Sequence, residues 1–194
     1  MKTRVSKTAA FFLPLLIVLL TVSAFGQRRD YLSDSEVELV RDAQQIDLRI
    51  DVLTMAIDRR MIALNLAGED KSKKFGEKWG DAPTGTRLEL LTDVKMLLQK
   101  AIDDIDDASS HESENSENKV TGTLFPKAVR TLAAAAERYR PMFRSAIDTT
   151  KDDKEKGIIL ASIDFCDQVI EASAKLPKET AKPGKKKRSK DNGN

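Results

Sequence analysis

The chain has little of the residues that most often carry chemistry, with one cysteine, Cys166, and one histidine, His111, among 194 residues. A lone cysteine cannot form an intramolecular disulfide, so the core alone must stabilise the fold. One histidine is too few for the Glu-x-x-His pairs of di-iron bundles or for a structural zinc site, and a C-x-x-C-H haem-attachment motif is absent. We therefore predict no catalytic residues, no metal site and no cofactor, and we favour a protein that is not an enzyme.

Long apolar runs are also lacking, because the longest, residues 9–22, is shorter than the roughly 20 residues that a membrane-spanning helix needs. Basic residues precede this run and small residues follow it: Lys2, Arg4 and Lys7, then Ser23, Ala24 and Gly26. This order is typical of a cleavable secretory signal peptide. We assign residues 1–26 to the signal, with cleavage after Ala24 or Gly26, and we expect export by general secretion to the periplasm or the cell exterior.

Other uses of the N-terminal segment fit the residues less well. A lipoprotein needs a cysteine directly after the apolar run, and the chain has none there. A twin-arginine signal needs its arginine pair before the run, whereas Arg28 and Arg29 follow it. An uncleaved membrane anchor stays open as an alternative, because the run can be extended to Gly26.

Charge is divided unevenly between the middle of the chain and its C-terminal end. The net charge is +2, but the C-terminal tail, residues 177–194, is strongly basic, and an acidic excess lies between the signal and the tail. The tail has almost nothing apolar to pack, so we predict that it is disordered. Its cations are a candidate electrostatic tether to an anionic envelope surface or an acidic protein: Lys182, Lys185, Lys186, Lys187, Arg188 and Lys190. A solubilising role is the simpler alternative, and nucleic-acid binding is not expected because no aromatic residues alternate with these cations.

Apolar residues recur at helical spacing in the first segment after the signal, residues 33–68. It opens with Ser33 and Glu36, which have the spacing of a capping box, and it then repeats an apolar residue every three or four positions. We therefore predict one long helix. The charged residues between the members of the stripe, including Arg59 and Arg60, are expected on a solvated outer face.

Three more amphipathic segments follow along the chain: residues 86–107, a segment that starts near Pro126, and residues 151–176. Pro141 removes one backbone donor, so a kink or break is expected near Arg138. The polar stretch 109–118 is predicted to be a flexible loop.

This pattern predicts an all-α fold, specifically an antiparallel four-helix bundle with up-down topology. The bundle domain would span residues 27–176, after the signal and before the tail. The segments share no repeated residue pattern, which argues against a helical solenoid. A seam as regular as that of residues 33–68 can also pair with a second copy, so a homo-oligomer remains open.

Two aromatic residues, Phe75 and Trp79, stand out in the glycine-rich connection 68–85. They are four positions apart, so they can share one face of a short turn and seal an end of the bundle. The alternative is that they line a ligand groove. Cys166 has apolar helical spacing and is predicted to be a buried core thiol.

The stretch Tyr-Leu-Ser-Asp-Ser-Glu-Val-Glu-Leu-Val-Arg-Asp-Ala-Gln, residues 31–44, is followed by Arg49 and by the Arg59-Arg60 pair. It resembles the opening of a group of uncharacterised exported helical proteins of bacteria, which have Leu-Thr/Ser-x-x-Glu followed by Arg-x-Ala-Gln. The resemblance covers residues 31–60. It implies a bacterial envelope protein, and it carries over no activity and no functional residues.

Together these patterns predict an exported bacterial protein that binds or scaffolds in the cell envelope and has no membrane span after cleavage. The alternative is a ligand-binding or peripheral enzymatic bundle that uses a groove near Trp79 and the kink at Pro141.

Overall fold

The computed structural model describes residues 30–67, 75–114 and 121–177, and within these ranges its regular structure is entirely helical. The elements are α2 (Asp34–Asp42), α3 (Ile46–Ala63), the 3₁₀ helix η3 (Glu77–Trp79), α4 (Arg87–Glu114), α5 (Thr121–Thr149) and α6 (Asp153–Ala174). The prediction of an all-α helical bundle is confirmed. The predicted signal peptide, residues 1–26, and the six cations of the tail lie outside the described residues.

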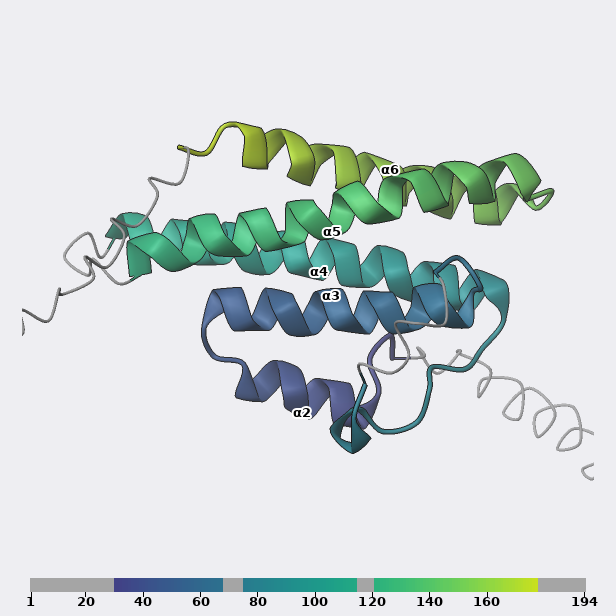
Figure 1. Cartoon of the computed structure of the whole chain (residues 1–194), viewed down its shortest axis with the longest axis horizontal. Helices are drawn as coiled ribbons and strands as arrows, with labels where there is room; N and C mark the ends of the chain where they lie inside the picture. The colour runs from purple at the N-terminus through teal and green to yellow at the C-terminus, as the bar shows by residue number, and fades with distance from the viewer. Residues whose placement is uncertain (1–29, 68–74, 115–120, 178–194) are drawn as a thin grey trace, which may run out of the picture. The chain divides into compact units, whose positions relative to one another are not determined.

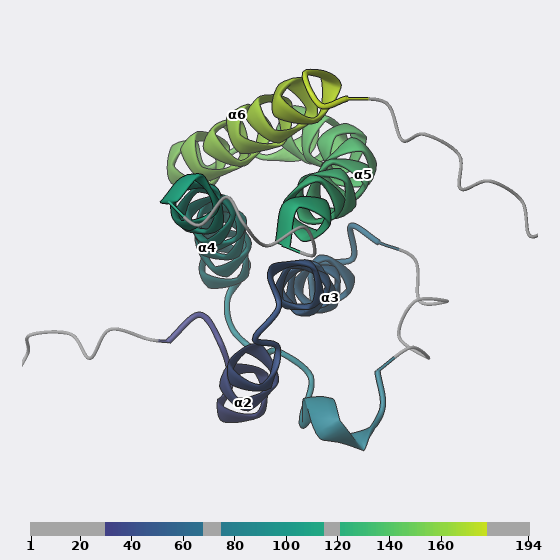
Figure 2. The ribbon, with the colours of Figure 1, turned by 90° about the vertical axis from the view of Figure 1, so that its left-hand side faces the viewer.

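The four longer helices pack as two pairs, α3 with α4 and α5 with α6 (Figure 1). The pairs meet where α3 packs along α5 and α4 packs along α6. Lys127 of α5 binds Asp47 near the start of α3, and Arg138 lies near Asp58 further along, so α3 and α5 run in the same direction. Helix α2 and η3 contact each other on the outer side of α3 (Figure 2). None of the helices in the described ranges is both long and apolar enough to cross a membrane.

Aliphatic side chains fill the core between these helices. The residues at its centre are fully buried, among them Ile50, Leu53 and Ile57 of α3 and Leu97 and Leu98 of α4. Helix α5 adds small residues that allow close helix approach, and also the two largest fully buried side chains: Ala128, Ala133, Ala135 and Ala136, then Tyr139 and Phe143. Cys166 is 0% exposed, which confirms the predicted core thiol.

The segment predicted as one helix, residues 33–68, is in fact two. Its capping box is confirmed, because Ser33 and Glu36 each accept the other's backbone N–H. The helix then ends at Asp42, and α3 begins at Ile46. The break folds α2 back along α3, which a continuous helix cannot do. Along one helix, Glu36 and Arg59 would lie about 35 Å apart, whereas they form a hydrogen bond of 2.7 Å.

Two further predicted boundaries differ from the structure. A kink or a break was predicted near Arg138; helix α5 continues through Pro141, so there is no break. Pro141 is exposed, whereas Tyr139 and Phe143 on either side of it are buried in the core, and this packing keeps the segment helical. Helix α4 extends to Glu114, into the stretch 109–118 that was predicted to be a loop.

Candidate functional site

Helix α3 carries charged residues on two sides, and each side forms a different kind of site. Toward α2 and η3, Arg59 and Arg60 are 5% and 3% exposed, which corrects their predicted place on a solvated face. Toward α5, Asp51 and Asp58 are half-buried along a groove. We name the first site the arginine network, which consists of Glu36, Arg59, Arg60 and Asp93, and the second the α3–α5 groove.

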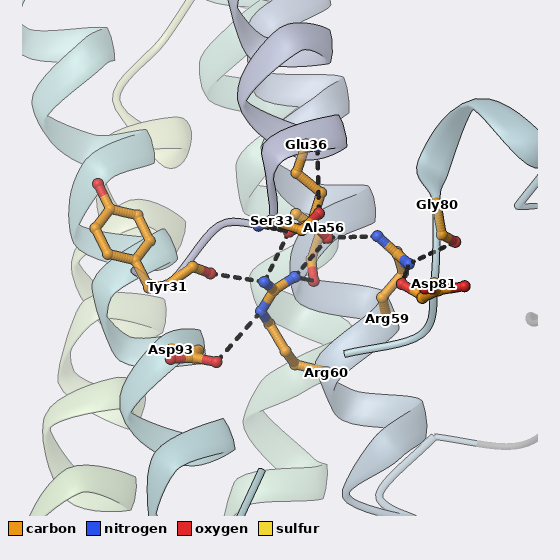
Figure 3. A network of polar contacts seen from close by, with 9 residues as sticks. All are labelled: Tyr31, Ser33, Glu36, Ala56, Arg59, Arg60, Gly80, Asp81 and Asp93. Atoms are coloured by element: carbon orange, nitrogen blue, oxygen red, sulfur yellow. Dashed lines mark hydrogen bonds and ion pairs between the residues drawn. The ribbon is translucent and has the colours of Figure 1, made fainter. Parts of the chain in front are cut away.

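Glu36 is the centre of the arginine network (Figure 3). Its side chain is fully buried, and it accepts three hydrogen bonds of 2.7 Å, one from Arg59 and two from Arg60. The backbone N–H of Ser33 donates a fourth, at 2.9 Å. Burial raises the pKa of Glu36, but the hydrogen bond and charge of Arg60, the N–H of Ser33 and the charge of Arg59 outweigh it. The pKa therefore lies below its ordinary value, and Glu36 is ionised at neutral pH.

Arg60 connects the network to other parts of the chain (Figure 3). Its Nη2 donates to the carbonyl oxygen of Tyr31 at 2.6 Å, and its Nη1 donates to the carbonyl oxygen of Ala56 at 2.9 Å. Its Nε lies 3.8 Å from Oδ2 of Asp93 on α4. Arg60 thus holds the segment before α2 and the start of α4 against α3.

Arg59 holds the loop around η3. Its Nη2 donates to the carbonyl oxygens of Gly80, at 3.3 Å, and of Asp81. Its guanidinium lies 5.9 Å from the ring centre of Phe75 and 5.6 Å from that of Trp79. The two rings meet edge to face with their centres 5.5 Å apart. Cation–π contacts and hydrogen bonds therefore fix this loop on α3.

The α3–α5 groove has a volume of about 400 Å³, which is within the range of small-molecule sites. It mixes carboxylates, one guanidinium, hydroxyls and apolar side chains from α3, α5 and the segment before η3. The residues that line it are Asp51, Thr54, Met55, Asp58, Phe75, Thr131, Ala134, Ala135 and Arg138.

Asp58 has partners at one end of the groove. Its Oδ1 lies 2.8 Å from the hydroxyl oxygen of Tyr139, which also lies 3.0 Å from the carbonyl oxygen of Thr54, so these two acceptors share the single proton of that hydroxyl. Its Oδ2 lies 3.6 Å from Nη1 of Arg138, whose guanidinium is 5.4 Å from the ring centre of Tyr139. Burial, together with the charge and hydrogen bond of Asp58, raises the pKa of Tyr139 well above its ordinary value, so its hydroxyl stays protonated and donates.

Asp47 has a partner at the other end, and Asp51 lies between the two. Asp47 is 3% exposed, and its Oδ2 accepts a hydrogen bond of 2.5 Å from Lys127. Asp51, one turn further along α3, accepts no hydrogen bond through its carboxylate from the described residues. Burial and the charge of Asp47 raise the pKa of Asp51, and the charge of Lys127 offsets only part of this rise. Asp51 is therefore the one acid of these three that has no close partner in the part of the chain that the structure describes.

The structure separates the two predicted groove residues. Phe75 lines the α3–α5 groove, whereas Trp79 is 2% exposed and packs beneath Arg59. The two residues were predicted to share one face of a short turn, and their rings do lie against each other, edge to face. Sequence reasoning missed the other residues of both sites. The burial of Arg60 could have been predicted from its spacing. It lies seven residues after Leu53 and four before Leu64, which places it within the apolar stripe.

Cys166 supplies no reactive thiol to either site. Burial raises its pKa to about 12, and the charge of Asp167 adds to this rise, so the thiol stays protonated at neutral pH. Among the residues that the structure describes, no group of three or more His, Cys, Asp or Glu is placed to hold a metal ion.

The fold and the two sites define an all-helical protein with a buried ion-pair network on one side of a central helix and an open groove on the other. No protein-family model, curated protein or solved structure matches the chain.

Proposed function

We propose that this protein is an exported, non-enzymatic binding or scaffolding protein of the bacterial cell envelope. Export is supported by the signal pattern of residues 1–26, and the envelope by the resemblance of residues 31–60. One observation supports binding. The buried charges of the arginine network bind each other, whereas the α3–α5 groove presents apolar surface beside Asp51, whose carboxylate has no close partner within the described ranges.

The proposal includes an antiparallel four-helix bundle with up-down order for α3, α4, α5 and α6. Its support is the direction of the helices. Arg60 near the end of α3 lies by Asp93 near the start of α4, so these two helices run in opposite directions. Arg87 at the start of α4 pairs with Glu155 at the start of α6, so these two run in the same direction.

Export is tested by expressing the full chain in a bacterium and separating the cytoplasm, the membranes and the exported fraction. We expect mature protein in the exported fraction, with a mass that corresponds to cleavage after Ala24 or Gly26. A Leu16→Arg variant is the control, because a charge in the apolar run should block export. Uncleaved protein in the membranes would support an anchor instead, and uncleaved protein in the cytoplasm would contradict export.

The tail is the proposed surface for anionic partners, and its support comes from the sequence alone. The test measures sedimentation of the full chain with vesicles of anionic lipid and of neutral lipid. We expect binding to anionic vesicles only, weakened by salt and lost when Lys185, Lys186, Lys187 and Arg188 are changed to Gln. The matched control neutralises four exposed cations of the bundle: Lys78, Arg144, Lys151 and Lys154. Equal binding by both variants would show that the tail is not the tether.

A specific observation also favours the narrower function of binding a small ligand. The α3–α5 groove is large enough for one, and Phe75 reaches it. Trp79 and Pro141 are not among its lining residues, so the candidate groove lies between α3 and α5. A ligand that binds the folded chain raises its melting temperature. Thermal unfolding of the dialysed protein with candidate ligands therefore tests this function.

A further inference from the structure

Among the residues that the structure describes, the charges along the α3–α5 groove do not balance. Helix α3 presents three acids toward α5, and α5 presents two cations in return, Lys127 and Arg138. Lys127 binds Asp47 at one end, and Arg138 lies by Asp58 near the other. Asp51, the acid between them, forms no ion pair with a cation of the described residues.

We propose that the α3–α5 groove binds a small organic monocation, such as a primary amine on an apolar body, with Asp51 as the residue that receives the ammonium group. This inference rests on the proposed ligand-binding role of the groove. Asp51 lines the groove and has no hydrogen-bond donor among the described residues. A ligand ammonium supplies that donor and balances the unmatched charge, and a charge-assisted hydrogen bond of this kind is among the stronger polar contacts in proteins.

The remaining lining suits the apolar part of such a ligand. Met55 is 42% exposed and follows Asp51 by one turn of α3, so its side chain offers apolar surface beside the acid. Phe75 and Ala134 border the same space from the loop and from α5. Aromatic and thioether side chains also favour a nearby cation or aromatic group. The groove thus places apolar surface beside an acid.

An anionic ligand fits less well, because the cation in the groove is already engaged. Arg138 lies 3.6 Å from Asp58 and 5.4 Å from the ring centre of Tyr139. To bind an anion, Arg138 would have to leave Asp58, and the anion would then meet both Asp51 and Asp58. Charge repulsion therefore selects against anions.

The test uses three probes of nearly the same shape and different charge: benzylamine, benzyl alcohol and benzoate. Each is titrated into the full chain and followed by the shifts of its backbone amide signals in NMR spectra. We expect benzylamine to bind at least tenfold more tightly than the other two, with its largest shifts around Asp51 and Thr131. An Asp51→Asn variant should weaken benzylamine about tenfold and leave benzyl alcohol unchanged.

Matched variants distinguish the effect of removing the charge of Asp51 from the effect of filling the groove. Ala134→Leu fills the groove without a change of charge and should block benzylamine. Asp164→Asn and Ala174→Leu make the same changes at exposed positions of α6 and should leave binding intact. The amide spectrum of each variant shows whether it is folded.

Two results would overturn the inference in distinguishable ways. If benzyl alcohol or benzoate binds as tightly as benzylamine and Ala134→Leu blocks it, the groove binds ligands but the charge selection is wrong. If none of the three probes binds, both the charge selection and the ligand-binding role of the groove are wrong. Export and vesicle binding, which are measured separately, would stand in either case.

Discussion

The two sides of α3 use charged residues in opposite ways. Toward α2, Arg59 and Arg60 are buried, and Glu36 binds both guanidinium groups. Toward α5, Asp51 is only half-buried, and none of the described residues donates a hydrogen bond to its carboxylate. A buried charge is strongly destabilising without a partner, whereas a half-exposed one keeps part of its hydration. The comparison indicates that the first side holds the structure together and that the second is free to bind.

The two sides are not independent, because Arg59 connects them. Its guanidinium lies over Phe75, which lines the α3–α5 groove, and it binds the backbone of Gly80 after η3. The arginine network therefore fixes one wall of the groove. Damage to the network should change the groove, while changes at Asp51 should leave the network intact.

The largest expected effect comes from Glu36→Gln, which leaves two buried guanidinium groups without their carboxylate. We expect a loss of about 3–5 kcal/mol in the free energy of unfolding, measured by urea denaturation at pH 7. Glu38→Gln on the same helix is the control, because its partner Arg41 is exposed and such pairs contribute about 0–1 kcal/mol. Equal losses in the two variants would mean that the network does not hold α2.

The stability that Glu36 contributes should also depend on pH. Its pKa in the folded state lies below the ordinary value of 4.5. The contribution is therefore complete above pH 4.5 and is lost as the pH falls from there through the folded-state pKa. We expect the difference in unfolding free energy between the wild type and Glu36→Gln to be largest at neutral pH and to shrink in acid. A difference that is constant with pH would contradict this assignment.

Tyr139→Phe should have the next largest effect, because it removes a buried donor at the end of the α3–α5 groove. Asp58 and the carbonyl oxygen of Thr54 would lose the one proton that they share, and we expect a loss of about 1–3 kcal/mol in the free energy of unfolding. Tyr31→Phe is the control, because its hydroxyl forms no hydrogen bond with the described residues. We also expect Tyr139→Phe to strengthen benzylamine binding, because Asp58 would lose a hydrogen-bond donor and could interact more strongly with the ammonium group.

The helices could be predicted from sequence because their signals are local. The apolar spacing alone predicts α6 within two residues of its observed ends, and Asp152 caps its start in the structure. The break between α2 and α3 could not be predicted in this way, because the apolar stripe keeps its spacing through Ala43 and Ile46. What decides the break is a contact between Glu36 and Arg60, 24 positions apart, and no local pattern reports such a contact.

The α3–α5 groove was harder to predict for the same reason. Phe75 was identified from its spacing with Trp79, but the helices that form the groove pair residues about 80 positions apart, as Asp47 and Lys127 do. Which acid is left without a cation depends on how α3 and α5 align. That alignment follows from packing of the whole core, which the sequence pattern does not specify.

Two glycines provide a smaller test, because substitution by Ala should change the stability in opposite directions at Gly80, which Arg59 binds, and at Gly157, which lies in α6. Gly157 in α6 has open space where a Cβ would lie, so Gly157→Ala should stabilise the protein by about 0.5–1 kcal/mol. Gly80 has a φ of +62°, and a Cβ there would lie 2.7 Å from Oγ of Ser35. Gly80→Ala should therefore destabilise the protein and loosen η3 on α2. Thermal unfolding shows whether each variant melts above or below the wild type. A higher melting temperature for both variants would contradict the close contact between Gly80 and Ser35.

Asp51→Asn should have the smallest effect on stability, and this prediction tests the comparison most directly. Burial raises the pKa of Asp51, so the folded state disfavours its charge, and a neutral amide of the same size removes that cost without breaking a hydrogen bond. We expect the free energy of unfolding, measured by urea denaturation at pH 7, to change by no more than about 0.5 kcal/mol. This change is much smaller than the loss expected for Glu36→Gln. A loss as large as that of Glu36→Gln would make Asp51 a structural residue like Glu36. The two sides of α3 would then not differ in kind, and Asp51 would not be free to bind a ligand cation.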